Sequence, residues 1–182
     1  MKKIKLVGLF ILCAFVSTNT SAQTKMVGGA AMYPTKNIVE NAVNSKDHTT
    51  LVAAVKAAGL VPTLQSEGPF TVFAPVNKAF DALPAGAVET LLQPENKAKL
   101  TTVLTYHVIP GKLSSMELMK MVKSNNGKAT LKTAAGENIY ISMKGKNLMV
   151  TDENGGMAHI TIADVNQSNG VIHVIDKVLL PK

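Results

Sequence analysis

The stretch Gly68-Pro-Phe-Thr-Val-Phe-Ala-Pro-Val-Asn-Lys-Ala-Phe80 predicts a short buried strand that runs directly into a helix. Apolar residues at alternate positions, such as Phe70 and Val72, are typical of a strand with one face in a core. Pro75 ends the strand, because proline has no N–H to donate to a neighbouring strand. Asn77 is then expected to be the N-cap of the helix that follows.

A second stretch, Asn169-Gly-Val-Ile-His-Val-Ile-Asp-Lys-Val-Leu-Leu-Pro181, predicts a long apolar strand near the end of the chain that is stopped by Pro181. Neither stretch contains a nucleophile beside a base or a set of metal ligands. The best-specified parts of the sequence therefore specify architecture rather than chemistry.

Residues 1–22 have the pattern of a secretory signal peptide. Three lysines surround the start of an apolar run over residues 4–16, and Thr20-Ser21-Ala22 offers small residues for cleavage. A retained anchor helix and a lipoprotein built on Cys13 are the alternatives, but the run is short for a membrane span, which needs about 20 apolar residues. We expect export to the periplasm or secretion to the extracellular medium, with no transmembrane anchor after cleavage. Gly-rich residues 23–36 predict a flexible lead, and residues 37–182 a single domain.

Composition excludes several classes of function. Cleavage removes three lysines, so the formal net charge falls from +7 to +4. The chain has no arginine and no tryptophan, whereas nucleic-acid surfaces usually combine arginine forks with stacking rings. The single cysteine, Cys13, lies in the leader, which leaves the domain without a disulfide or a thiolate metal site.

The pattern changes from helical to extended along the domain. Helical spacing dominates up to residue 124, where Leu100, Val103, Leu104 and His107 form one apolar stripe. After Asn125-Asn-Gly127 the period is two, and short turns separate successive strands, so these strands should pair antiparallel. Helices in the first half and strands in the second predict the α+β class.

Three segments, in this order, resemble the fasciclin-like domain family: Gly68–Phe80, Leu104-Thr-Tyr-His-Val-Ile-Pro-Gly111 and Asn169–Pro181. The resemblance extends from about Ile38 to Pro181 and is closest to the single-domain secreted bacterial type. It implies a wedge in which N-terminal helices pack on a mostly antiparallel β-sheet sandwich. It also implies adhesion, or contact with another protein, outside the cytoplasm; a few relatives bind lipophilic small molecules.

The resemblance suggests where a partner would bind. The second segment contains the family's Tyr-His pair, here Tyr106 and His107, although the helical stripe equally predicts His107 as a hydrogen-bonded core residue. Asp164 and Val165 keep an acid–aliphatic pair of the family's adhesive segment in animals. Ile162-Ala163 replaces the usual Glu-Pro there, so integrin-type recognition is not implied.

Methionines and lysines supply two further candidate surfaces. Met116, Leu118, Met119 and Met143 are candidates for an apolar groove that carries a small hydrophobic ligand, although methionine also fills cores. The lysines are expected on a solvated face, or on a face that meets an acidic polysaccharide; they are Lys120, Lys123, Lys128, Lys132, Lys144 and Lys146.

No motif indicates catalysis, a metal or a cofactor. The sequence lacks Gly-x-Ser-x-Gly, a P-loop and a dinucleotide fingerprint. His159 and His173 are conceivable as a metal pair on adjacent strands, but such a site would still need a third ligand, such as Asp152, Asp164 or Asp176, and nothing in the spacing demands the site. His48 is expected to be solvated. We therefore expect a monomeric, non-enzymatic module that binds a cell-surface or biofilm-matrix protein or polysaccharide.

Overall fold

The computed structural model describes residues 24–182, so the predicted signal peptide at residues 1–22 lies outside the described residues. Within them, a seven-stranded sheet has the order β4-β3-β9-β8-β7-β6-β5. β3 and β9 pair in parallel, and the other neighbours pair antiparallel. The strands are β3 (Phe70–Pro75), β4 (Val108–Pro110), β5 (Lys128–Lys132), β6 (Asn138–Lys144), β7 (Asn147–Thr151), β8 (Met157–Gln167) and β9 (Gly170–Ile175).

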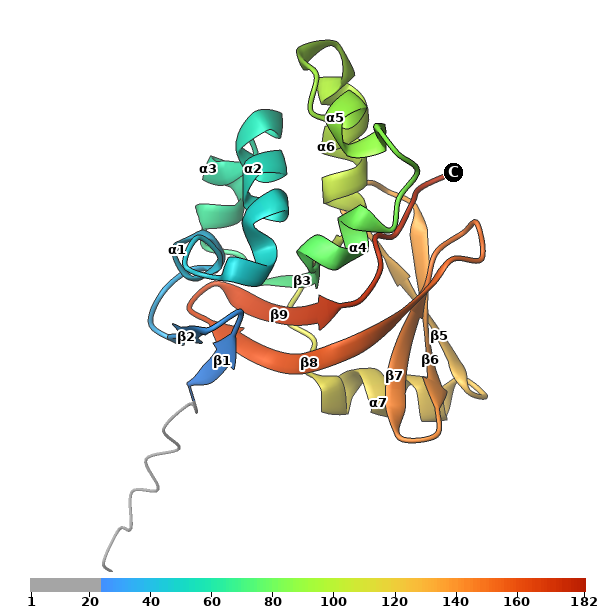
Figure 1. The fold of residues 1–182 in the computed structure, drawn as a ribbon. Helices are drawn as coiled ribbons and strands as arrows, with labels where there is room; N and C mark the ends of the chain where they lie inside the picture. Colours follow the sequence, from blue (N-terminus) through green and yellow to red (C-terminus); the bar gives the residue numbers. More distant parts are fainter. Residues whose placement is uncertain (1–23) are drawn as a thin grey trace, which may run out of the picture.

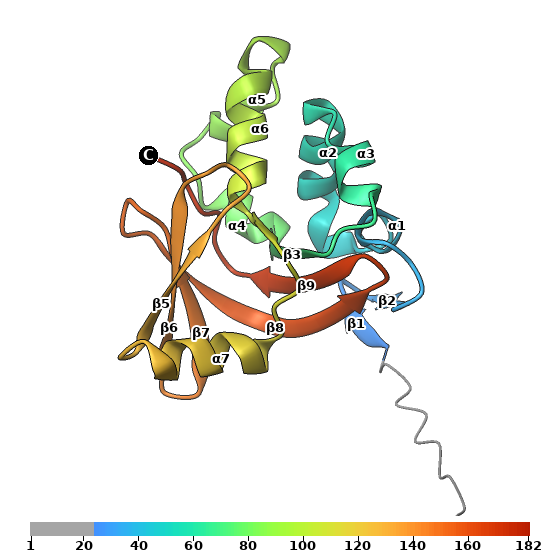
Figure 2. The same cartoon turned by 180° about the vertical axis from the view of Figure 1, so that it is seen from behind.

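Two groups of helices lie on opposite sides of the middle of the sheet (Figure 1). Six helices and two 3-10 turns precede β5 on one side, and α7 lies on the other, against β5 and β6 (Figure 2). They are α1 (Ile38–Ala42), η1 (Lys46–His48), α2 (Thr49–Ala58), α3 (Val61–Gln65), α4 (Asn77–Asp81), α5 (Ala87–Leu91), η2 (Pro94–Asn96), α6 (Lys97–Tyr106) and α7 (Ser115–Ser124). The α+β class and the fasciclin-like arrangement are confirmed.

The central strands β3 and β9 separate two hydrophobic cores. Val72 and Ala74 of β3 belong to the first core, which the helices α1, α2, α3 and α6 close. Phe73 points to the opposite side, into a second core closed by α7 and by β5–β8. Because the two strands are covered on both faces, they carry nearly continuous apolar residues, as expected for buried parallel strands.

Two glycines allow the first and third of the fasciclin-like segments to lie side by side. A Cβ atom on Gly170 would lie 2.1 Å from the carbonyl oxygen of Phe70. Gly68 has φ +72°, and a Cβ atom there would lie 2.3 Å from the carbonyl oxygen of Asn169. The parallel pairing therefore requires glycine at both positions, because any side chain would push the strands apart.

Over its described part, residues 24–36, the segment is not the flexible lead that the sequence predicts. Lys25–Val27 (β1) and Ala30–Met32 (β2) form an antiparallel hairpin. Val27 and Met32 are buried in the first core, so burial holds this segment in place.

Two details of the sequence-based strand and helix boundaries are also corrected. β9 ends at Ile175 rather than continuing to Leu179. Asn77 is not an N-cap of α4, whose cap position is Val76. Its side chain instead accepts the N–H of Thr50 at 3.1 Å and so caps the start of α2 from another helix.

Candidate functional site

Tyr106, the first residue of the Tyr-His pair, is fully buried at the end of α6. Its hydroxyl donates to the carbonyl oxygen of Asn138 at 2.8 Å and accepts the N–H of Glu153 at 3.1 Å. Burial raises the pKa of Tyr106 to about 12, so the group stays a neutral phenol. Its role is to join α6 to the start of β6 and to the β7–β8 turn.

His107 is likewise buried and has a partner for each ring nitrogen. Nδ1 lies 2.8 Å from the carbonyl oxygen of Val103, and Nε2 accepts the N–H of Leu179 at 3.0 Å. Burial lowers the pKa of His107 to about 4. The core-histidine interpretation is confirmed, and the predicted partner contact at Tyr106 and His107 is corrected, because neither side chain reaches the surface.

Asp164 and Val165 are also used internally. Val165 is buried in the first core. Asp164 has φ +55° and accepts hydrogen bonds from the N–H of Ser115, at 2.6 Å, and from the Ser115 hydroxyl. Burial opposes ionisation of Asp164, but these bonds outweigh it and lower its pKa. Asp164 positions the start of α7 while Val165 packs in the core, so the two residues do not present an exposed acid–aliphatic motif.

The four residues of the predicted methionine groove do not come together. Leu118 is fully buried in the second core, while Met119 and Met143 pack against that core from the sides. Met116 is 74% exposed and, with Met119, lines only an open depression on α7. Neighbouring positions of a helix face different directions, so α7 divides this set between core and solvent.

Lysines gather on the lobe formed by α7 and β5–β7. We call Lys120, Lys123, Lys128, Lys132, Lys144 and Lys146 the lysine cluster; all six are exposed. Glu137 is the single acidic residue between Leu118 and Thr151. Within residues 24–182, no lysine of the cluster forms an ion pair with a carboxylate. Nζ of Lys128 lies 3.9 Å from the ring centroid of Tyr140, which fixes one cation on the outer face of the sheet.

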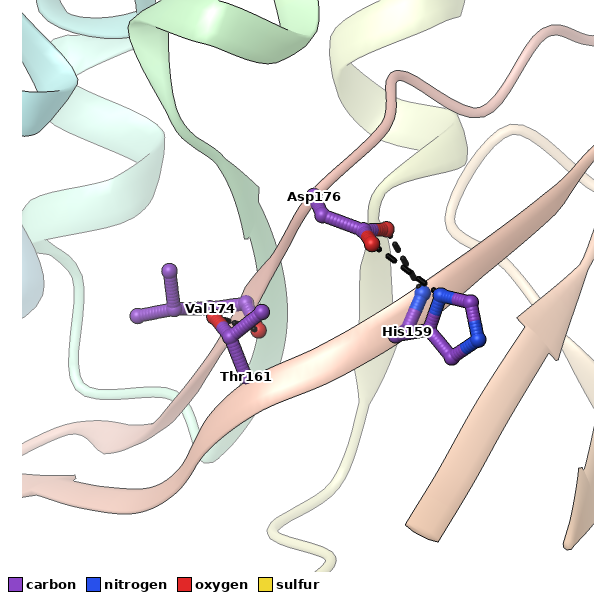
Figure 3. Close-up of polar contacts among 4 residues, drawn as sticks. All are labelled: His159, Thr161, Val174 and Asp176. Carbon is purple, nitrogen blue, oxygen red and sulfur yellow. Dashed lines mark hydrogen bonds and ion pairs between the residues drawn. The ribbon is translucent and has the colours of Figure 1, made fainter. Parts of the chain in front are cut away.

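An exposed histidine–aspartate pair lies where β8 passes the end of β9 (Figure 3). Nδ1 of His159 is 3.0 Å from Oδ2 of Asp176, whose Oδ1 accepts the His159 N–H at 2.7 Å. The neighbouring Thr161 hydroxyl donates to the Val174 carbonyl at 3.3 Å, so it supports the pairing of β8 with β9. Both side chains of this pair are more than a third exposed, so solvent screens the interaction between them.

His159 does not share a metal site with His173. His173 is fully buried, stacks on Phe73, and places Nε2 2.8 Å from the carbonyl oxygen of Leu113. Among residues 24–182, no group of three His, Cys, Asp or Glu side chains is arranged to hold a metal ion.

An apolar cavity of about 120 Å³ lies in the first core, between β3–β9 and the helices α1, α2, α3 and α6. Its floor includes Val72 and Ile172, and its walls include Leu51, Val55 and Leu104. Lys56, Thr63 and Ala134 line it and are exposed, so the cavity reaches the surface.

His48 lines this cavity and is buried. The sequence-based expectation that it is solvated is therefore wrong. Nδ1 lies 2.8 Å from the Ser45 hydroxyl. Nε2 has no hydrogen-bond partner, and it is the one buried side-chain nitrogen or oxygen in the described residues with none. Burial lowers the pKa of His48; the nearby Ala74 carbonyl and Asp47 offset part of this shift.

Sequence reasoning missed His48 because its burial depends on partners far along the chain. Local signal was limited to Ser45 three residues before it, a spacing that brings both side chains to one side of a helical turn. The cavity itself has no sequence signature, since its lining comes from elements spread between β1 and β9.

The comparisons with known proteins agree with the fold. The family model for the fasciclin domain matches residues 46–181, and the chain belongs to this family. It is 46% identical to protein sll1483 of Synechocystis sp. strain PCC 6803, over 92% of this chain and 86% of that protein. It is 31% identical to immunogenic protein MPB70 of Mycobacterium bovis, over 96% of this chain and 91% of that protein.

Two further matches connect the domain with larger proteins. The chain is 39% identical to the transforming growth factor-beta-induced protein ig-h3 of Sus scrofa, over 72% of this chain but 17% of that protein. A structure of a FAS1 domain pair from the insect cell adhesion molecule Fasciclin I matches with a TM-score of 0.72 and 18% identity. That match covers 80% of this chain and 51% of the other, and it supports the fold alone.

No helix among the described residues is long and apolar enough to cross a membrane.

Proposed function

We propose that this protein is an exported recognition module that binds a negatively charged component of a cell surface or extracellular matrix through its lysine cluster. The observation that carries the proposal is the row of exposed lysines on α7, β5 and the β6–β7 turn, with no carboxylate partner in the described part of the chain. Unpaired cations on a rigid lobe attract an acidic surface without prior rearrangement. Tyr140, which holds Lys128 by a cation–π contact, adds a flat apolar contact beside this charge.

Two other features support recognition rather than turnover. The titratable side chains of His107 and His173, which are buried, and of Asp164, which is half-buried, are occupied by internal hydrogen bonds. The Fasciclin I structure that shares the fold comes from a cell adhesion molecule. Both fit a domain that acts through its surface.

Binding to the native cell envelope tests this proposal. In the full chain, Lys123, Lys128, Lys144 and Lys146 are changed to glutamine; the control changes Lys46, Lys78, Lys97 and Lys99, which are exposed on the helical side. Each variant loses four positive charges. We expect the cluster variant to lose most of its binding to envelope and matrix fractions, at least about tenfold, while the control keeps its binding. Equal losses would show a general charge effect and would contradict a specific lysine surface.

A second candidate function, a carrier of a small apolar ligand, is favoured by the cavity rather than by the methionines. The depression beside Met116 is open to solvent, whereas the cavity lined by Val55, Leu104 and Ile172 is largely surrounded by apolar side chains. Extraction of the protein from its native host, followed by mass spectrometry, tests this function. A bound apolar compound is expected; a clean extract, together with no thermal shift against a panel of apolar compounds, would count against it.

A further inference from the structure

The outward face of α7 combines an exposed apolar side chain with two cations. Met116 is 74% exposed, the largest fraction among the exposed large apolar side chains of the described residues. Lys120 and Lys123 follow it at i+4 and i+7, so all three lie on one face of the helix. Leu118 and Val122, which are buried in the second core, mark the opposite face. α7 therefore presents Met116 and the two lysines directly to solvent.

The β6–β7 turn adds two further cations at the same end of the molecule. Lys144 and Lys146 lie at this turn and are exposed. In Figures 1 and 2 the turn and α7 lie together at the lower end of the fold, away from α2, α5 and α6. Glu117 is the acidic residue of α7, and its Oε2 accepts the N–H of Ser114 at 2.6 Å and the Ser114 hydroxyl at 2.7 Å. This end therefore has four exposed lysines and one carboxylate that already caps the helix.

The other two lysines of the cluster face a different way. Lys128 and Lys132 alternate along β5 with Ala129 and Leu131, which are buried in the second core together with the inner face of α7. Because successive side chains of a strand point to opposite faces, these two lysines lie on the outer face of the sheet. The lysine cluster thus has two parts on different faces, and Met116 belongs to the part on α7.

The combination on α7 fits a lipid surface better than a water-soluble polyanion. An apolar side chain gains free energy when it leaves water, which the headgroup region of a membrane allows and a hydrated polysaccharide does not. Lysine has a long apolar stem, so its cation can reach a phosphate while the stem stays beside the lipid. Lysines close to an anionic lipid surface are attracted to it. An anionic leaflet therefore matches both the apolar and the charged part of this face.

We infer that the outward face of α7, together with the β6–β7 turn, is a membrane-contact surface for an anionic lipid leaflet. Met116 enters the headgroup region, and the four lysines of α7 and the turn bind lipid phosphates. The inference rests on the function proposed for the lysine cluster, and it names anionic lipid as the partner and α7 as the contact. α7 has ten residues, so it lies on the membrane surface and does not span it.

A single tryptophan tests how the molecule is oriented on the lipid. The chain has no tryptophan, so Met116→Trp and the control Met157→Trp each introduce one reporter. Met157 is also exposed, but it pairs with Thr151, at the far end of β7 from the β6–β7 turn. Each full chain is mixed with vesicles of equal parts phosphatidylglycerol and phosphatidylcholine whose brominated acyl chains quench tryptophan on contact. Any contribution of residues 1–22 to vesicle binding is the same in both variants.

We expect the fluorescence of Met116→Trp to shift to the blue and to be quenched, and the fluorescence of Met157→Trp to stay as it is in water. Vesicles of phosphatidylcholine alone should leave both signals unchanged, because they lack net negative charge. Equal quenching of the two variants on the anionic vesicles would overturn the inference, since it would show that the protein has no fixed orientation on the lipid.

Charge-matched lysine changes in the Met116→Trp chain test the contribution of each face. Changing Lys120 and Lys123 to glutamine should raise the vesicle concentration for half-maximal quenching by about tenfold or more. Changing Lys128 and Lys132 removes the same charge from the outer sheet face and should raise it by less than about threefold. Equal effects of the two pairs would contradict a contact through α7. All four side chains are exposed, so both cores are left intact.

The outcomes separate this inference from the function on which it rests. If Met116→Trp is not quenched on anionic vesicles, but the lysine cluster is still required for binding to the native envelope, lipid is the wrong partner and recognition of an acidic polysaccharide or protein stands. If vesicles are not bound and the cluster is not required for envelope binding, both are wrong.

Discussion

The imidazole Nε2 of His107 accepts the backbone N–H of Leu179 at 3.0 Å, which ties the end of α6 to the segment that follows β9. This bond requires an unprotonated Nε2, since a protonated imidazole has no acceptor. His107 is therefore a structural group whose protonation breaks a contact between two of the segments that resemble the fasciclin family.

Acid should destabilise the fold in the window set by His107. Its pKa is about 4 in the folded chain and about 6.5 when unfolded, so between these values the unfolded chain binds more protons. The free energy of unfolding should be constant above about pH 6.5 and fall by about 3 kcal/mol from pH 7 to pH 4 through this group alone. Burial also lowers the pKa values of His48 and His173, which adds loss in the same direction.

Urea unfolding at pH 7 and pH 4.5 measures this effect, with His107→Gln as the comparison. The glutamine variant is less stable at pH 7 but should lose less stability on acidification. An identical acid-induced loss in both proteins would contradict the assignment to His107.

Gly170→Ala should be strongly destabilising. Its Cβ atom would lie 2.1 Å from the carbonyl oxygen of Phe70, a backbone atom of the paired strand that cannot rotate away. We expect a loss of about 3 kcal/mol or more in the free energy of unfolding. Gly136→Ala is the control, because its φ is +91° but nothing lies within 4 Å of the new atom. It should cost about 1 kcal/mol; similar losses for both would refute the close-approach argument.

Asn77→Ala removes the cap that α4 supplies to α2. The N–H of Thr50 loses its acceptor, and the bonds from the Asn77 amide to Lys46 and Thr49 are also lost. Thermal unfolding should show a loss of about 1–2 kcal/mol. Asn44→Ala, which removes one exposed bond to the Glu40 carbonyl, should cost less than about 0.5 kcal/mol.

Tyr106→Phe separates a structural role from a binding role. The variant leaves the N–H of Glu153 and the carbonyl of Asn138 without the hydroxyl, so stability should fall by about 1–2 kcal/mol. Binding to the envelope at a temperature where the variant is fully folded should be unchanged. If folded Tyr106→Phe lost binding, Tyr106 would have to contribute to the partner-binding surface.

Elements that depend on local pattern were predictable from the sequence. The alternation around Val72 and the period-two segments after residue 127 gave the strands, and short turns gave their antiparallel pairing. The hairpin of β1 and β2 was missed, because two three-residue strands around Gly28-Gly29 have the local pattern of a linker. What stabilises the hairpin is the burial of Val27 and Met32 in the first core, which the local sequence does not show. Asn77 was assigned to the wrong helix, because its acceptor oxygen reaches an N–H 27 positions earlier.

Site residues were harder to predict than the fold. Tyr106, His107, Asp164 and Val165 were chosen from motif resemblance, which does not distinguish a residue kept for packing from one kept for binding. The lysine cluster was visible in the sequence, since exposed charge needs no long-range partner. The partner-free Nε2 of His48 was not, because it depends on what the rest of the fold leaves unpaired.

The central claim is that charge on one lobe mediates recognition, and the salt dependence of binding tests it most directly. The affinity of the purified chain for its native envelope is measured between about 50 and 500 mM salt, where screening of exposed charges changes most. We predict a steep fall in affinity for the unmodified chain and for the control with four helical-side lysines changed, and a weak, nearly flat response for the cluster variant. Tight binding that ignores salt, or that is the same in all three proteins, would contradict the account.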